Sequence, residues 1–516
     1  MRLIALCALL AVAAPGSLCE RRNPQVCREQ DPALACAPGL VCRRGRCQEP
    51  ECTDHAGCRD GARPICSQHI CVGCESDAQC RQRDPTAPFC QSGRCVACAR
   101  AADCSDGLRP ICDAQSGTCR ACLRHSECAP GVCAKDSLLS DLPGPLAIPA
   151  GSCVPPERVL VVDAARCVPP HLCSAREALD RVSPMQPYIV LRSGQGAMFT
   201  DLAVPGPNNT SGLRVVHLIG PMADTPPTQA RTRPVTLGSP LSRALLVRSG
   251  HHLVVEGLHI EGGVTGVECA GMAQPEATRL EVLRSVIGNT EVGILANRCH
   301  VVIQESWIGA GFPPLFGGML GNRLALKLVN TRFVIENVVL FRNGLLGFGG
   351  IDLVYDPMWQ GGLSYIVNST IAHHSAPSAS GAVSLECNTS VTDHLVVFNT
   401  FIYNDLLRWE MHPTRHIAPA CRPQVSALAT NDPDLARESS DIVLVRTDAE
   451  AGLSDPRAGN LRLRADAPTS IAEGGVQRFE RGSVEIVAPR TDIEGTPRGQ
   501  RRPGHVSIGS FEAPGP

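Results

Sequence analysis

The sequence predicts a mainly β protein in which a small disulfide-rich repeat module precedes a parallel β-helix, a solenoid built from short strands. Three observations on the 516 residues lead to this prediction. Twenty of the 28 cysteines lie between Cys27 and Cys153. An eight-residue pattern of strand, turn and strand recurs from Leu253 onward. Glycine (48 residues) and proline (42 residues) are abundant, which favours turns over long helices.

The first 19 residues have the pattern of a signal peptide. Arg2 supplies a positive charge ahead of an apolar stretch at residues 3–14, and residues 11–13 (AVA) match a cleavage site. No later stretch approaches the roughly 18–20 apolar residues that a membrane span needs. We therefore expect a protein exported to the extracellular space or to the outer surface of the cell envelope, where disulfides persist.

The composition excludes several classes of function. A net charge of −2 with 19% charged residues argues against a nucleic-acid binder, which needs a basic patch. Aromatic residues make up 3% of the chain and offer few stacking platforms. The chain has no phosphate loop, zinc helix motif or nucleophile elbow, so no cofactor and no metal is expected.

Five units of four cysteines occupy residues 20–155. The last four units begin 22, 24 and 24 residues apart, which is an internal repeat. A unit of this size cannot bury a core, so cross-links must replace one. Zinc is the alternative, because the pairs Cys71/Cys74, Cys95/Cys98 and Cys119/Cys122 have ribbon spacing, but export favours disulfides. The cysteines expected in disulfides, with connectivity left open, are Cys27, Cys36, Cys42, Cys47, Cys52, Cys58, Cys66, Cys71, Cys74, Cys80, Cys90, Cys95, Cys98, Cys104, Cys112, Cys119, Cys122, Cys128, Cys133 and Cys153.

The cysteines outside this module can also pair. Cys167 with Cys173, Cys269 with Cys299 and Cys387 with Cys421 would complete the set, the last two on neighbouring coils. Cys19 is left over and is a candidate for a lipid anchor. Leu18 makes a poor lipidation signal, because a small residue is wanted there, so plain secretion stays open.

The β-helix is expected over residues 156–425, with a closing region at residues 426–516. Within each eight-residue copy the first, third, sixth and eighth positions favour apolar or small residues, as strands with alternating side chains require. Such strands at coil-length intervals are typical of a solenoid. The copies begin at Leu253, Leu280, Val301, Phe333, Ser364 and Leu395, with steps of 27, 21, 32, 31 and 31 residues.

The second turn residue of the copies suggests a structural ladder. This position holds Gly257 and then Asn337, Asn368 and Asn399, the residues that best tolerate a left-handed backbone. Coils stack about 4.8 Å apart, so the three amides could hydrogen-bond in a row.

The cysteine units resemble the myxococcal-type cysteine-rich repeats that occur in tandem in bacterial surface proteins. The resemblance covers residues 27–153 and depends mainly on spacing, with residues 63–66 (RPIC) returning at residues 109–112. It implies a surface-exposed module.

The rest of the chain resembles right-handed parallel β-helix proteins of the choice-of-anchor Q type. Residues 172–179 (LCSAREAL) look like their capping helix and residues 254–263 (VVEGLHIEGG) like their first regular coil. Their C-terminal blocks are matched at residues 431–433 (NDP), 463–475 (LRADAPTSIAEGG) and 492–498 (DIEGTPR). The resemblance implies a right-handed, pectin-lyase-like fold in a bacterial protein. Ala472 and Ser507 stand where the family usually has aspartate, which argues against a carboxylate-dependent role there.

Catalytic candidates are weak. Enzymes on such folds place acids or bases at one register of neighbouring coils, and we identify no such set, because Asp352 is expected to lie alone opposite Val383. Solvated turn residues and loop-packing tryptophans are the ordinary interpretation, and the tail at residues 498–502 (RGQRR) is expected to be solvated. The remaining candidates are Asp352, Asp356, His373, His374, Glu410 and His412, with Trp359 and Trp409 as residues that could stack on a sugar.

The sequence therefore favours an exported, envelope-associated or secreted, non-catalytic surface protein. Its expected partner is a polysaccharide held along the coils, or another surface protein, and it is expected to be a monomer that touches a membrane only through a lipid. The alternative is a polysaccharide lyase, hydrolase or epimerase.

Overall fold

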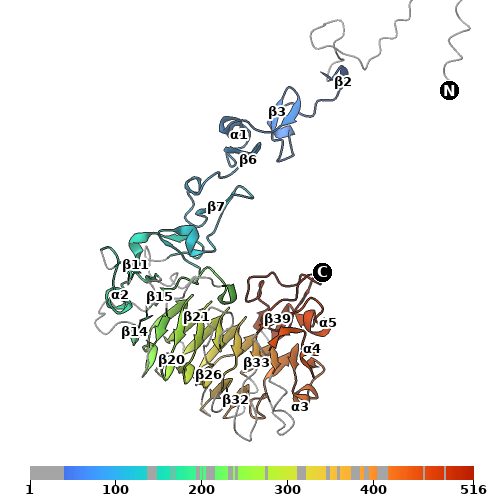
Figure 1. Cartoon of the computed structure of the whole chain (residues 1–516). Coiled ribbons are helices and arrows are strands. Elements are labelled where there is room, and N and C mark those ends of the chain that lie inside the picture. The colour runs from blue at the N-terminus through green and yellow to red at the C-terminus, as the bar shows by residue number, and fades with distance from the viewer. Residues whose placement is uncertain are drawn as a thin grey trace, which may run out of the picture. The chain divides into compact units, whose positions relative to one another are not determined.

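The chain forms two compact units, Met1–Ala121 and Cys122–Pro516 (Figure 1). The division falls after Ala121, so the fifth cysteine unit belongs with the β-helix. No helix in the described part of the chain is long and apolar enough to cross a membrane. The computed structural model describes residues 36, 40–135, 148–163, 165–166, 169–192, 198–199, 201–204, 215–229, 236–238, 242–272, 277–310, 321–344, 349–356, 359, 361–372, 384–388, 394–403, 416–456, 460–481 and 484–515.

The first compact unit is built from cystine-linked antiparallel hairpins. In the second, third and fourth units the first cysteine bonds to the third and the second to the fourth, which resolves the connectivity and excludes zinc at these cysteines. The pairs are Cys52–Cys66, Cys58–Cys71, Cys74–Cys90, Cys80–Cys95, Cys98–Cys112 and Cys104–Cys119. The elements are β1 (Val41–Arg43), β2 (Arg46–Gln48), η2 (His55–Gly57), β3 (Ile65–Ser67), β4 (Ile70–Val72), α1 (Asp77–Arg83), β5 (Phe89–Gln91), β6 (Arg94–Val96), η3 (Ala101–Asp103), β7 (Ile111–Asp113) and β8 (Thr118–Arg120).

The first cysteine unit is described only in part. Cys36 bonds to Cys47, and Cys42 is also in a disulfide. Cys19, Cys27 and Cys167 lie outside the described residues.

The fifth cysteine unit repeats the same pattern at the start of the second compact unit. Cys122 bonds to Cys133 and Cys128 to Cys153. Its elements are η4 (His125–Cys128), β9 (Val132–Cys133) and β10 (Cys153–Val154). Val132 and Val154 of this unit pack against Tyr188 and Ile219 of the β-helix. The unit therefore covers the outer face of the first coils.

Three parallel sheets, here called A, B and C, form the β-helix, and each coil from β12 to β32 contributes one strand to each sheet. The short helix α2 (Ala175–Arg181) packs its buried Leu179 on the first coils, and η7 (Pro156–Arg158) and η8 (Pro227–Gln229) lie between strands. Sheet A contains β11 (Val159–Val162), β12 (Tyr188–Leu191), β15 (Val215–Ile219), β18 (His252–Glu256), β21 (Arg279–Leu283), β24 (His300–Gln304), β27 (Arg332–Glu336), β30 (Ser364–Val367), β33 (Leu395–Phe398) and β35 (Gln424–Ser426).

Sheets B and C follow sheet A along the coils from β12 to β32. Sheet B contains β13 (Met198–Phe199), β16 (Thr236–Gly238), β19 (His259–Glu261), β22 (Val286–Gly288), β25 (Trp307–Gly309), β28 (Val339–Phe341), β31 (Thr370–Ala372), β34 (Phe401–Tyr403), β36 (Leu428–Thr430) and β37 (Ile442–Leu444). Sheet C contains β14 (Leu202–Val204), β17 (Arg243–Val247), β20 (Thr265–Ala270), β23 (Val292–Asn297), β26 (Leu324–Val329), β29 (Ile351–Val354) and β32 (Leu385–Cys387). The prediction of a mainly β, parallel β-helical fold is thus confirmed.

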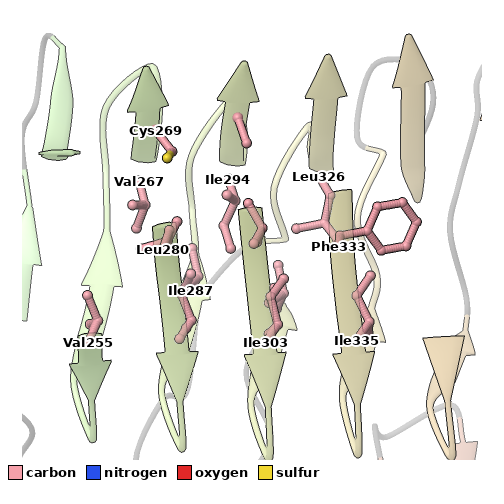
Figure 2. Close-up of a cluster of buried hydrophobic side chains, with 14 of the residues drawn as sticks. Val255, Val267, Cys269, Leu280, Ile287, Ile294, Ile303, Leu326, Phe333 and Ile335 are labelled. Carbon is pink, nitrogen blue, oxygen red and sulfur yellow. The ribbon is translucent and has the colours of Figure 1, made fainter. Parts of the chain in front are cut away.

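The core is a set of aliphatic columns between the three sheets. Val255, Ile303 and Ile335 from sheet A face Ile294 and Leu326 from sheet C (Figure 2). Each lies at the same register as its equivalent on the next coil, because parallel strands pair without offset.

Two disulfides join neighbouring coils. They link Cys269 to Cys299 and Cys387 to Cys421, which are the pairs that the coil register allowed. All four cysteines are at most 6% exposed.

The closing region folds back over the outer faces of sheets A and B. Ile471 and Phe511 pack on Trp307 and Phe401 of sheet B, and Ile486 packs on Phe398 of sheet A. The elements are α3 (Pro433–Ala436), α4 (Asp448–Ala451), β38 (Leu453–Asp455), β39 (Asn460–Leu463), α5 (Thr469–Ala472), β40 (Gly475–Val476), β41 (Arg478–Arg481), β42 (Val484–Val487) and β43 (His505–Val506).

The basic tail is not simply solvated, contrary to the sequence-based expectation. The side chain of Arg498 is 2% exposed and pairs with Glu512 at 3.4 Å. It also donates to the Oδ1 of Asn337 at 2.6 Å. Arg498 therefore fixes the closing region to the coils, a role that only the folded chain reveals.

Candidate functional site

The three turn asparagines bind the closing region and do not form an uninterrupted ladder. All three are left-handed, with φ of 54° at Asn337, 45° at Asn368 and 47° at Asn399. Asn399 donates to Asn368 at 3.3 Å, but Asn337 donates to the carbonyl of Thr491 at 2.7 Å. The amides therefore provide hydrogen bonds to a second layer of chain, which is a structural role.

Asp352 does not lie alone, and the expected register opposite Val383 was wrong. Asp352 pairs in register with Lys327 on one side and with Glu386 on the other. The inward alternation of Ile351 and Leu385 sets this register, whereas the glycine alignment that suggested Val383 does not.

This carboxylate pair has perturbed acidity. The Nζ of Lys327 lies 3.8 Å from the Oδ2 of Asp352, whose side chain is 24% exposed. Burial raises the pKa of Asp352, and Lys327 counteracts this in part. Burial and the charge of Asp352 raise the pKa of Glu386. The two acids thus lie on adjacent coils, and burial shifts the pKa of both in the same direction.

Asp356 and Trp359 are engaged in local packing. Asp356 accepts a hydrogen bond from the Nδ2 of Asn330 at 2.6 Å, and Arg298 lies 3.9 Å away. The ring of Trp359 lies 4.5 Å from that of Tyr355. These contacts are those of turn and loop residues. The candidates His373, His374, Trp409, Glu410 and His412 lie outside the described residues.

A polar column on the outer face of sheet A was missed by the sequence analysis. His252, Arg279, His300 and Arg332 occupy the same register on four successive strands, β18 to β27. Each is the residue just before one copy of the eight-residue template, so a comparison extended by one position would have found it. The statement that no such set recurs at one register was therefore wrong. We call these four residues the sheet A column.

The middle of the sheet A column is electrostatically distinct from its start. His252 contacts Glu281 at 3.0 Å, and Arg279 contacts the same carboxylate at 2.6 Å. The Nε2 of His300 is buried without a hydrogen-bond partner among the described residues. Burial, together with the charges of Arg279 and Arg332, lowers the pKa of His300 to about 4. His300 is therefore neutral at pH 7 between two permanent cations.

Among the described residues, the apolar clusters formed by the two neighbouring layers lie on either side of the column. The fifth cysteine unit packs on strands β11 to β15, and the β41–β42 hairpin packs on β30 and β33. Between them, Val302 and Val334 lie next to the column, and Gln304 and Glu336 lie beyond. Burial raises the pKa of Glu336, which accepts from Gln304 at 3.3 Å.

A second polar cluster lies where the fifth cysteine unit meets sheet A, and it is centred on the fully buried Glu256. The Oε2 atom of Glu256 accepts hydrogen bonds from the Nε2 atoms of His125 (3.0 Å) and His217 (2.9 Å). The Oε1 atom contacts Lys135 at 2.7 Å and also Arg284. Although burial alone would raise it, these partners hold the pKa of Glu256 well below its usual value.

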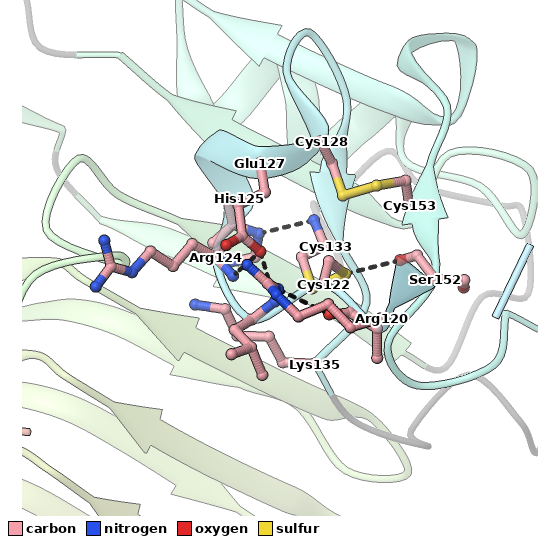
Figure 3. The surroundings of a disulfide bond; sticks show 12 residues. Arg120, Cys122, Arg124, His125, Glu127, Cys128, Cys133, Lys135, Ser152 and Cys153 are labelled. Atoms are coloured by element: carbon pink, nitrogen blue, oxygen red, sulfur yellow. Dashed lines mark hydrogen bonds between the residues drawn. A yellow bond between two sulfur atoms is a disulfide. The ribbon is translucent and has the colours of Figure 1, made fainter. Parts of the chain in front are cut away.

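The Glu256 cluster fits a structural clamp and does not fit a metal site. One ligand atom each from His125, His217 and Glu256 lie within 4.8 Å of one another. However, the Nδ1 of His125 accepts the backbone N–H of Cys133 at 3.2 Å (Figure 3). The ring proton must then sit on Nε2, which leaves no lone pair there for a metal. Lys135 and Arg284 would also repel a cation.

The clamp has a second contact with the same cysteine unit. Asp224 accepts the backbone N–H groups of His125 at 2.6 Å and of Ser126 at 2.7 Å. Lys135 reaches Asp224 at 3.4 Å. Two carboxylates of the β-helix therefore hold the fifth cysteine unit.

Comparison with known proteins finds a family match over the cysteine module, and that family has no known function. Residues 42–159 match a family of unknown function, DUF8331. No curated protein matches the chain. Among solved structures the chain is similar to pectate lyase Pel9A, with 12% identity and a TM-score of 0.35, over 69% of this chain and 96% of that chain.

Proposed function

We propose that this chain is an exported surface protein of the bacterial envelope, or a freely secreted one, that binds an extended anionic polysaccharide along sheet A without turnover. The single observation behind the proposal is the sheet A column. Stacked strands lie about 4.8 Å apart, so the column presents a polar group at each step of a line parallel to the coil axis. A linear polymer repeats its own groups at comparable intervals.

The chemistry of the column suits carboxylate or sulfate groups. Guanidinium groups match the planar geometry of such anions and stay charged. The disulfide-rich module and the parallel β-helix are compatible with a surface protein in an oxidising environment.

The proposal is tested by retention of the purified secreted chain on a panel of immobilised anionic and neutral polysaccharides. The double variant Arg279→Gln/Arg332→Gln should lose retention on the anionic polymer. The matched control is Arg243→Gln, which removes another outer-face arginine that pairs with Glu268 at 2.7 Å on sheet C. Equal retention of the double variant and the control would contradict the proposal.

A second candidate function is catalysis on a polysaccharide, and the Asp352–Glu386 pair favours it. The pKa of both acids is raised by burial, which is the direction of shift that a general acid needs. The same panel measures it through new reducing ends and the ultraviolet absorbance of unsaturated uronates. Turnover that is lost in Glu386→Gln would replace the binding proposal by an enzymatic one.

A further inference from the structure

The second cysteine unit has a histidine, His55, at the position equivalent to His125, through which the fifth unit binds the β-helix. In each unit the residue three positions after the first cysteine lies at the start of a helical turn. His55 holds this position in the second unit and His125 in the fifth. The two units also share the disulfide pattern, first to third and second to fourth.

Both histidines make the same internal hydrogen bond. The Nδ1 of His55 accepts the backbone N–H of Cys66 at 3.0 Å, as the Nδ1 of His125 accepts that of Cys133 at 3.2 Å. A neutral ring that accepts at Nδ1 carries its proton on Nε2. Each histidine therefore keeps a second ring group, Nε2–H, that its internal hydrogen bond does not use.

The internal bond alone does not require histidine. In the third unit Asp77 accepts the N–H of Cys90 at 2.8 Å, and in the fourth unit Ala101 cannot accept at all. What histidine adds is the second ring donor, Nε2–H. In the fifth unit this donor bonds to Glu256 at 3.0 Å. In the second unit the described residues provide no hydrogen-bond partner for the Nε2 of the half-buried His55.

We propose that the second cysteine unit, Cys52–Cys71, docks onto a partner protein by donating the Nε2–H of His55 to a carboxylate on that partner's surface. The fifth unit supplies the precedent, since it is held by a glutamate from another part of the fold. The partner is thus a protein with an exposed Asp or Glu whose carboxylate forms no ion pair within that partner. This inference is independent of the polysaccharide site on sheet A.

The test uses the full secreted chain and poly-L-glutamate as the carboxylate probe, with poly-L-lysine as the opposite-charge control. Binding is measured on immobilised protein by biolayer interferometry. The decisive variant is His55→Asn. Its side-chain oxygen can accept the N–H of Cys66, as Asp77 accepts that of Cys90, but it lacks the second ring donor, Nε2–H. His69→Asn is the matched control, because His69 lies in the same unit and its Nδ1 contacts the carbonyl of Cys52 at 3.3 Å.

We expect the wild type and His69→Asn to bind poly-L-glutamate with the same affinity. His55→Asn should bind about tenfold more weakly, because it loses one charge-assisted hydrogen bond. Intact disulfides in His55→Asn, checked by mass spectrometry, show that the unit is folded. Equal binding by His55→Asn, or no binding by the wild type, would overturn the proposal. Retention on polysaccharide that depends on His55 would also overturn it, because the ligand would then not be a protein carboxylate.

Discussion

Replacing Glu256 by glutamine should release the fifth cysteine unit from sheet A. The change keeps the size of the side chain but removes the charge that faces Lys135 and Arg284. Breaking a buried ion pair costs about 3–5 kcal/mol. We expect a loss of about 3 kcal/mol in the stability of the docked unit. The loss is at the low end because Lys135 retains its ion pair with Asp224 at 3.4 Å and Arg284 retains its ion pair with Glu305 at 2.9 Å.

The assay is amide hydrogen exchange of residues 122–135, followed by mass spectrometry. A local loss of about 3 kcal/mol corresponds to roughly 150-fold faster exchange if the unit opens independently of the coils. The control is Glu281→Gln, since Glu281 is also buried and paired with a histidine and an arginine but lies one coil further along. Unchanged exchange at residues 122–135 in Glu256→Gln would refute the clamp.

Three further predictions concern stability. His259 and His300 both have a pKa of about 4, because burial favours the neutral ring. Below pH 6.5 the folded state therefore binds fewer protons than the unfolded state, so thermal stability should fall as the pH drops from 6.5 to about 4. The double variant His259→Gln/His300→Gln should flatten that decline. Arg498→Met should lower the free energy of unfolding by about 3–5 kcal/mol in denaturant titrations, whereas the exposed Arg502→Met should change it little. Gly257→Ala should lower the free energy of unfolding by more than about 2 kcal/mol, because φ is +66° and a Cβ would overlap the backbone of Ala223. Gly250→Ala, at φ +78°, places its Cβ in open space and should lower it less. Equal unfolding midpoints for the two variants would contradict this prediction.

Local patterns were enough to predict the coils but not the polar sites on them. The template starting at Leu253 marks inward residues, and Leu253 and Leu280 do pair in register inside sheet A. The sheet A column sits one residue earlier, at His252 and Arg279, where apolar periodicity carries no signal. A search for recurring polar residues at every offset from the template would have recovered it.

Sites that join distant segments could not be read from the sequence. Lys135 and Glu256 are separated by 121 residues, and no spacing rule connects them. Likewise Arg498 reaches Asn337 across 161 residues. For Asp352 the difficulty was register: glycines mark coil length, but the alternation of buried side chains decides which residue lies opposite Glu386. Such pairings depend on loop lengths that sequence patterns do not encode.

The most direct test of the central claim is calorimetric binding of a length series of oligomers of an anionic polysaccharide that the panel retains. If the ligand lies along the sheet A column, affinity should rise with oligomer length until the oligomer spans His252 to Arg332, and then level off. Arg279→Gln/Arg332→Gln should remove this dependence, while Arg243→Gln should leave it intact. Affinity that is independent of length, or unchanged in the double variant, would contradict the account.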